Sequence, residues 1–128
     1  MEKTETKKYS EFTDLTTWKE GHRLALLVYE LTKKFPKDEV FSLTNQLRRA
    51  AVSITSNIAE GFGRRHVKEK VQFWQIAIGS IYEVENQLIL SRDIGYITAN
   101  DYNKAKDLLI SSKKLCYSLI NSMTKSSI

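Results

Sequence analysis

The chain has 128 residues, of which 41% are hydrophobic and 27% are charged, and its net charge is +5 at neutral pH. These values are typical of one globular domain that buries about two-thirds of its unfolded surface. No apolar run is longer than Leu24–Tyr29, whereas a membrane span needs about 20 apolar residues. The single cysteine excludes an internal disulfide. The first eight residues have no apolar core that would make a secretory signal, so we expect a cytoplasmic protein without a membrane partner.

Residues 1–13 are polar, charged and aperiodic, which predicts a flexible N-terminal tail before a single domain over residues 14–128. The domain has helical periodicity interrupted at Pro36, at Gly61 to Gly63, and at Gly95. These three breaks divide it into four helices, and no alternating pattern predicts a strand. Short connections make neighbouring helices antiparallel. The predicted fold is therefore all-α, an up-down-up-down antiparallel four-helix bundle.

The first helix is expected over residues 17–34, where Thr17 and Glu20 have the spacing of a capping box. The second is expected over residues 40–60, with Gly61 as a left-handed terminator.

The third helix is expected over residues 67–94 and is the longest. The fourth is expected to begin near Thr98, whose hydroxyl can cap it, with Asp101 three residues on. Cys116 lies at core spacing within this last helix, which favours a buried, unreactive thiol.

The second helix carries a polar stripe beside its apolar face, which predicts contact with two different neighbours. The third helix has a matching row that mixes apolar and polar residues. If the chain folds back at residues 64 and 65, Arg49 faces Ser80, Ser53 faces Ile76, and Gln46 lies near Glu83. We interpret these rows either as ordinary helix packing or as a subunit interface, with Arg49 paired to Glu83 within the chain or across subunits. The expected structural polar seam comprises Gln46, Arg49, Asn57, Glu60 and Glu83.

No arrangement of side chains indicates catalysis, a metal site or a cofactor. The two histidines, His22 and His66, lie on different elements without a set of acidic partners that would make a metal site, and the Glu-x-x-His motif of di-metal bundles is absent. Gly61 and Gly63 follow a helix rather than a strand, so they form no phosphate loop. We therefore expect a protein that is not an enzyme.

Basic residues are concentrated around the second break. Residues 64–70 include four Lys or Arg and one acid, whereas residues 83–101 include four acids and one Arg. Long cations at a turn can follow the phosphates of a nucleic acid, although such a cluster can also be a plain solvated surface. The candidate nucleic-acid-binding residues are Arg48, Arg64, Arg65, Lys68 and Lys70.

Two segments carry a family resemblance, residues 46–54 (QLRRAAVSI) and residues 57–61 (NIAEG). They resemble the signature of the bacterial four helix bundle protein family, which includes proteins encoded in intervening sequences of large-subunit ribosomal RNA genes. The accessory variability determinant of diversity-generating retroelements is a related protein. Further matches are Asp14-Leu15-x-x-Trp18, Phe35-Pro36, the segment from Ile76 to Glu83, and Gly95-Tyr96-Ile97. His66 departs from the pattern, in which a small capping residue is expected.

The resemblance spans about residues 14–120 and implies the same four-helix fold. It also implies a homo-oligomer, most simply a ring pentamer, that associates with structured RNA or an RNA–DNA intermediate and has a reverse transcriptase as a candidate partner. The alternative is an oligomeric protein-interaction scaffold with no nucleic-acid role.

Overall fold

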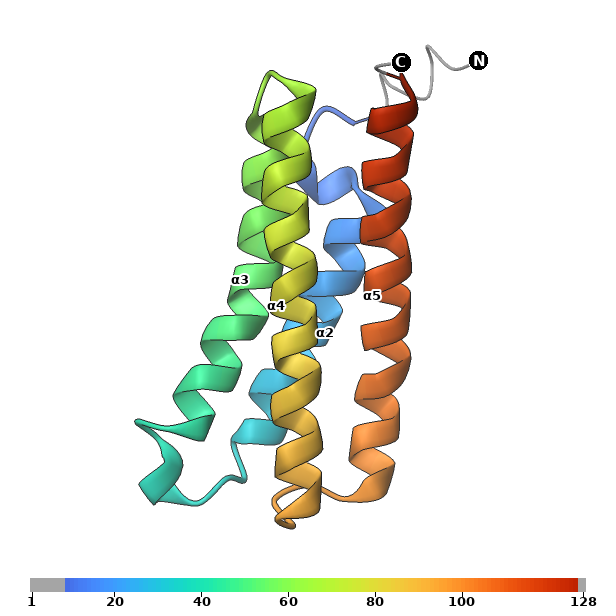
Figure 1. The fold of residues 1–128 in the computed structure, drawn as a ribbon. Helices are drawn as coiled ribbons and strands as arrows, with labels where there is room; N and C mark the ends of the chain where they lie inside the picture. The colour runs from blue at the N-terminus through green and yellow to red at the C-terminus, as the bar shows by residue number, and fades with distance from the viewer. Residues whose placement is uncertain (1–8, 127–128) are drawn as a thin grey trace.

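The computed structural model describes residues 9–126, and within them it contains four long helices and no strand. The chain runs up and down between neighbouring helices, so the predicted all-α, antiparallel four-helix bundle is confirmed (Figure 1). Helix α3 packs most extensively against α4, and α2 lies against both α3 and α5. The elements are η1 (Phe12–Asp14), α2 (Thr16–Thr32), η2 (Lys37–Glu39), α3 (Leu43–Gly63), α4 (Val67–Asp93) and α5 (Ala99–Ser126).

The core is a column of aliphatic side chains to which all four helices contribute at spacings of three and four residues. Fully burying one such side chain stabilises the fold by about 1.5–3 kcal/mol. Cys116 is buried among them, and this burial raises the pKa of its thiol to about 12. The fully buried aliphatic residues include Leu24, Leu47, Ile54, Ile58, Ile81, Leu88 and Leu109.

The N-terminal segment packs earlier than the sequence suggested. Residues 1–8 of the predicted tail lie outside the described part of the chain, whereas residues 9–13 lie within it. Phe12 belongs to η1, and its ring meets the Trp18 ring edge-on at a centroid distance of 5.6 Å. The packed part of the chain therefore begins before residue 14.

Only one of the two predicted capping boxes forms. Asp101 N–H donates to Thr98 Oγ1 at 3.0 Å, as expected for the start of α5. The box predicted at Thr17 is wrong, because α2 already begins at Thr16. The Thr17 hydroxyl instead donates to the Leu115 carbonyl at 3.4 Å, and Glu20 accepts a hydrogen bond from Ser111. Both side chains therefore tie α2 to α5.

Helix α3 begins and ends about three residues later than predicted. Gly61 lies inside the helix rather than terminating it. The position needs glycine for another reason, since the missing side chain makes room for Trp74. A Cβ on Gly61 would lie 2.5 Å from Trp74 Nε1. The left-handed conformation occurs instead at Gly95, whose φ is 89°, in the turn between α4 and α5.

The later end of α3 changes the register of the α3–α4 hairpin by about one turn. The Ser53 and Ser80 hydroxyls are hydrogen-bonded at 2.8 Å, whereas the sequence predicted that Ser53 would face Ile76. Because α3 continues to Gly63, the chain folds back nearer residue 66 than residue 64. The two rows do face each other, but with different partners from those expected.

Candidate nucleic-acid interface

The turn between α3 and α4 consists of Arg64, Arg65 and His66, and all three side chains are exposed. Arg64 N–H donates to the Gly61 carbonyl at 3.1 Å, which closes the end of α3. His66 occupies the N-cap position of α4 without a side-chain capping bond. This is the position at which the sequence departed from the family pattern, so the turn presents a bulky side chain where a small capping residue is usual.

The cations at this turn differ in whether a carboxylate of the same chain already pairs with them. Arg64 Nη2 lies 2.6 Å from Glu60 Oε2, and its guanidinium lies 4.9 Å from the centre of the Phe73 ring. Arg65 and Lys68 are exposed and take part in no ion pair among residues 9–126. Their charges are available to an anionic partner without breaking an existing contact.

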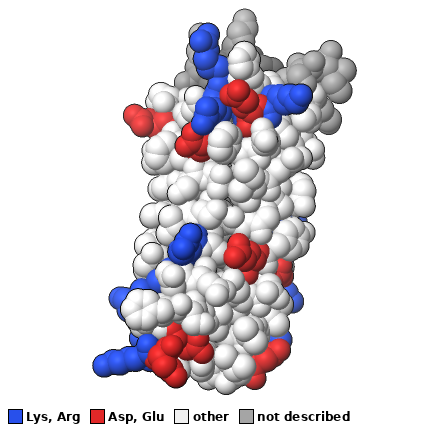
Figure 2. All heavy atoms as spheres, turned by 60° about the vertical axis from the view of Figure 1, so that its left-hand side comes forward, with Lys and Arg blue, Asp and Glu red and all other residues white. Residues whose placement is uncertain are grey.

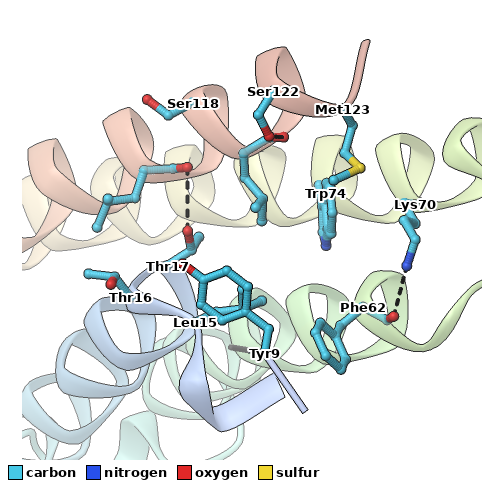
Figure 3. Close-up of a pocket in the computed structure, with 12 residues that line it drawn as sticks. Tyr9, Leu15, Thr16, Thr17, Phe62, Lys70, Trp74, Ser118, Ser122 and Met123 are labelled. Carbon is cyan, nitrogen blue, oxygen red and sulfur yellow. Dashed lines mark hydrogen bonds between the residues drawn. The ribbon is translucent and has the colours of Figure 1, made fainter. Parts of the chain in front are cut away.

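The Lys70 side chain caps the C-terminal end of α3 rather than pointing into solvent. Its Nζ donates to the Phe62 carbonyl at 2.9 Å, where α3 ends (Figure 3). It also donates to the Gly61 carbonyl at 3.4 Å. Its partial burial lowers its pKa. The ammonium of Lys70 satisfies the Phe62 carbonyl and gives the Gly61 carbonyl a second donor besides Arg64 N–H, which is a structural role.

Arg48 lies apart from the other candidates. It precedes Arg64 by 16 residues on the same helix, which corresponds to about 24 Å along the axis. Its Nε donates to Thr32 Oγ1 at 2.8 Å, and its guanidinium lies 4.6 Å from the centre of the Tyr29 ring. The five residues predicted as one basic set are therefore divided among three places: the turn, the α3 cap and the α2–α3 edge.

The polar seam forms in part. Asn57 Nδ2 donates to the Ser53 carbonyl at 2.8 Å and to the Ser53 hydroxyl at 3.1 Å, within α3. Glu60, expected in the seam, instead pairs with Arg64 at the exposed end of α3. Gln46 is exposed at the edge of the seam.

Arg49 and Glu83 form no ion pair within the described chain, so pairing of these residues in one bundle is wrong. Both are exposed, and the contact formed by Glu83 is a 3.5 Å hydrogen bond from Gln87 Nε2. The register is not the reason, because the pairing of Ser53 with Ser80 puts Arg49 at about the level of Val84, next to Glu83. The two exposed side chains nevertheless form no ion pair with each other. Pairing across subunits stays a prediction.

The outer face formed by α3 and α4 has few charges along its middle. Figure 2 views the molecule from the side of α3, where the blue and red residues gather mostly at the two ends and leave a largely uncharged band between them. Val52, Ile76 and Leu90 are exposed by 43%, 48% and 49%. Gly79 lies mid-helix in α4, and a Cβ there would meet nothing within 4 Å. We call these four residues the α3–α4 outer face.

A hollow of about 510 Å³ lies near the turn, between the ends of four elements (Figure 3). Lys70 is on its rim, and the remaining lining is mainly apolar. Sequence reasoning missed this hollow because its residues come from separate helices and form no local pattern. Its apolar lining includes Tyr9, Leu15, Phe62, Trp74, Leu119 and Met123.

Sequence reasoning also missed a contact cluster between α4 and α5. Lys113 Nζ lies 2.9 Å from Glu85 Oε1 and 4.4 Å from the centre of the Tyr82 ring. A hydrogen bond with Tyr82 raises the pKa of Tyr117. These tyrosines are nearly half exposed, and Ile110 beside them is 41% exposed. Tyr82 and Tyr117 lie on different helices, so no local pattern in the sequence indicated this cluster.

Metal chemistry has no support in the described residues. No group of three or more His, Cys, Asp or Glu within residues 9–126 could hold a metal ion. His22 is exposed and stacks on Trp18 at a centroid distance of 4.6 Å. Within the same part of the chain, no helix combines the length and apolarity that crossing a bilayer requires.

Comparison with known proteins gives a family and a fold. A family model described as "23S rRNA-intervening sequence protein" matches residues 13–118. A solved structure of a protein with unknown function, from the S23 ribosomal protein family of Bacteroides thetaiotaomicron, has a TM-score of 0.73 and 22% sequence identity. That match covers 82% of this chain and 98% of the other. No curated protein matches the chain.

Proposed function

Because the chain belongs to the family of 23S rRNA-intervening sequence proteins, we propose that it is a non-enzymatic, homo-oligomeric bundle that binds RNA. The single observation that carries this proposal is the pair of exposed, unpaired cations at the α3–α4 turn, Arg65 and Lys68. Arg64 lies beside them and could exchange Glu60 for a phosphate. The ligand class is structured RNA or an RNA–DNA intermediate.

Electrostatics would dominate this binding. Arginine and lysine side chains at a turn can follow a phosphate backbone, and contacts to phosphates carry no sequence information. Each phosphate neutralised on a duplex adds about 0.9 to the slope of log K against log salt. One turn therefore binds RNA weakly. Repetition of the turn in an oligomer raises the overall affinity, because several turns can bind one RNA at the same time.

The proposed oligomer is built on the α3–α4 outer face. Half-exposed Val52, Ile76 and Leu90 flank an uncharged band, and an interface core is depleted of charge in the same way. Arg49 and Glu83 lack ion-pair partners within residues 9–126, so each can pair with the other residue on a second copy. A ring pentamer is the form that the family resemblance implies.

The binding test compares two sets of variants that lose equal charge at opposite ends of the bundle. Wild-type protein should bind a structured RNA at 50 mM salt, and the affinity should fall steeply as salt rises. Changing Arg64, Arg65 and Lys68 to Ala should abolish binding without unfolding the bundle. Changing exposed Lys33, Lys34 and Lys37 to Ala is the matched control and should leave most of the affinity. Equal effects of the two triple variants would show that net charge, not the turn, binds RNA.

The assembly test changes one exposed residue. Ile76→Glu should leave the unfolding free energy of an isolated chain within about 0.5 kcal/mol, because the side chain is half exposed. In the oligomer it would place a carboxylate in an apolar contact, so light scattering should show a lower mass. A wild-type mass near 15 kDa at micromolar concentration would refute the oligomer.

The second candidate function is an oligomeric scaffold that binds protein and no nucleic acid. Exposed Tyr82, Ile110 and Tyr117 favour it, because tyrosines are enriched where interfaces concentrate their binding energy. A reverse transcriptase is the partner that the retroelement resemblance suggests. Wild-type protein that binds no structured RNA at low salt, yet captures such an enzyme through these residues, would favour the scaffold.

A further inference from the structure

Arg48 is held in place more firmly than a surface arginine usually is. Its Nε donates to Thr32 Oγ1 at 2.8 Å, and the Thr32 hydroxyl donates in turn to the Val28 carbonyl at 2.8 Å. Thr32 is 3% exposed, so this anchor is part of the core. The guanidinium also lies 4.6 Å from the centre of the Tyr29 ring, which adds a cation–π contact to this hydrogen bond. These contacts use Nε and one face of the guanidinium, and leave both terminal nitrogens without a partner among residues 9–126.

Arg48 and Arg49 lack the counter-charge that three other arginines of the bundle have. Arg23, Arg64 and Arg92 each pair with a nearby carboxylate. None of the ion pairs in the described chain includes Arg48 or Arg49, although they are consecutive. Two adjacent positive charges without an anion are less favourable than the same charges around one.

A hollow of about 490 Å³ lies where these arginines meet. Arg48 and Arg49 line it together with Asn45, whose amide can donate a hydrogen bond and whose side chain is exposed. The remaining lining is Tyr29, Val52 and Ser53, and no carboxylate is among these residues. A planar guanidinium that is already oriented loses little entropy when it binds a tetrahedral oxyanion with two parallel hydrogen bonds.

We propose that Arg48 and Asn45 form an oxyanion site on the α2–α3 edge and that it binds a phosphate group of the RNA backbone, while Arg49 beside it stays available to Glu83 of a second copy. The identity of the ligand rests on the RNA association proposed above, whereas the site itself rests on the contacts of Arg48. The site lies about 24 Å along α3 from the cations of the turn. One RNA could therefore be held at two separated points, which would make binding depend on the shape of the RNA.

The first experiment probes the site with inorganic phosphate, without RNA. In ¹⁵N-labelled protein, the Nε–H signal of Arg48 should shift saturably as sodium phosphate is added, and sodium chloride of equal ionic strength should not reproduce the shift. Asn45→Asp should weaken phosphate binding about 10-fold, because a carboxylate at that position can pair with Arg48 three residues on. This variant retains the Thr32 and Tyr29 contacts of Arg48, and an acid in the first turn favours a helix, so the fold should survive.

The matched control is Asn100→Asp, the same chemical change in the first turn of α5, which should leave phosphate binding unchanged. Arg48→Lys is a second variant, because it keeps the positive charge and removes the planar fork. It should weaken RNA binding about 10-fold with little change in the salt slope. Arg48→Ala should also lower that slope by about 0.9 on a duplex.

The outcomes separate the site from the function. A phosphate shift that Asn45→Asp removes, in a protein that binds no RNA, would support the oxyanion site and refute the RNA association. Intact RNA binding in Arg48→Lys and Asn45→Asp would refute the site and leave the function standing. Loss of oligomer mass in these variants, without any phosphate shift in the wild type, would mean that a second copy contacts Arg48, and would overturn the proposal.

Discussion

The indole of Trp74 occupies the space in which a side chain of Gly61 would lie. A Cβ added to Gly61 would be 2.5 Å from Trp74 Nε1, and that nitrogen donates to the Ile58 carbonyl at 3.2 Å. The ring cannot move aside without losing this hydrogen bond and its place in the core, where Trp74 is 2% exposed. Gly63, two residues further along α3, has nothing within 4 Å of the same position.

Gly61→Ala should therefore lower the free energy of unfolding by about 1–3 kcal/mol, because it overpacks the α3–α4 contact. Urea denaturation followed by tryptophan fluorescence would measure the change. Gly63→Ala is the matched control and should raise stability by about 0.5–1 kcal/mol or leave it unchanged, since alanine is the better helix former. Equal effects at the two glycines would show that Trp74 does not constrain Gly61.

Arg49 and Glu83 should be coupled only in the assembled protein. Single changes to Ala, and the double change, should give a coupling of about 0.5–3 kcal/mol in the free energy of association, measured by sedimentation. The same cycle, measured by unfolding at concentrations where the chain is monomeric, should show no coupling. Coupling in the monomer would mean that the two side chains meet within one bundle, in contrast to the structure, in which they form no ion pair within residues 9–126.

Lys70 and Lys68 should behave oppositely although they are two residues apart. Lys70→Gln removes an ammonium that caps the Phe62 and Gly61 carbonyls, so it should lower the melting temperature and leave the salt slope of RNA binding unchanged. Lys68→Gln should leave the melting temperature unchanged and lower the slope by about 0.9 on a duplex. A lower slope in Lys70→Gln would return this lysine to the RNA-binding set.

The hydrogen bond between Tyr96 and Glu39 should make stability depend on acid pH. The Tyr96 hydroxyl donates to Glu39 Oε2 at 2.7 Å, and this bond is the main reason that the pKa of Glu39 is below its ordinary value of 4.5. A carboxyl whose pKa is lower in the folded state contributes stability above its ordinary value, and loses it as pH falls through the folded value.

Tyr96→Phe should accordingly lower the melting temperature by a few degrees at pH 7, and the difference from wild type should shrink as the pH falls below 4.5. Tyr29→Phe is the control, since the Tyr29 ring contacts Arg48 and its hydroxyl forms no hydrogen bond within the described residues. A difference that is the same at pH 3 and pH 7 would mean that Glu39 is not the group involved.

Local patterns predicted the helices well, and contacts between helices explain where prediction failed. The Thr98–Asp101 box was readable because all of its atoms lie within four residues. Gly61 was misread because its role depends on Trp74, a residue of the next helix. That error moved the end of α3 by three residues, and with it the expected partner of Ser53.

The candidate site was predictable in composition and not in arrangement. Lys70 and Arg65 carry the same formal charge. Only the direction of the Lys70 side chain, toward the carbonyls at the end of α3, distinguishes their roles. The anchoring of Arg48 likewise depends on Thr32, which belongs to another helix. Charge count alone could not distinguish these cases.

The last turn of α3 is closed by side chains of α4. Trp74 satisfies the Ile58 carbonyl, and Lys70 satisfies those of Gly61 and Phe62. Neither helix can fray at this end without disturbing the other, so the two should open as one cooperative unit, with matching hydrogen-exchange protection on both sides of the turn. The cations at the turn are consequently mounted on a rigid hairpin tip, and a partner that binds there would have little loop to order.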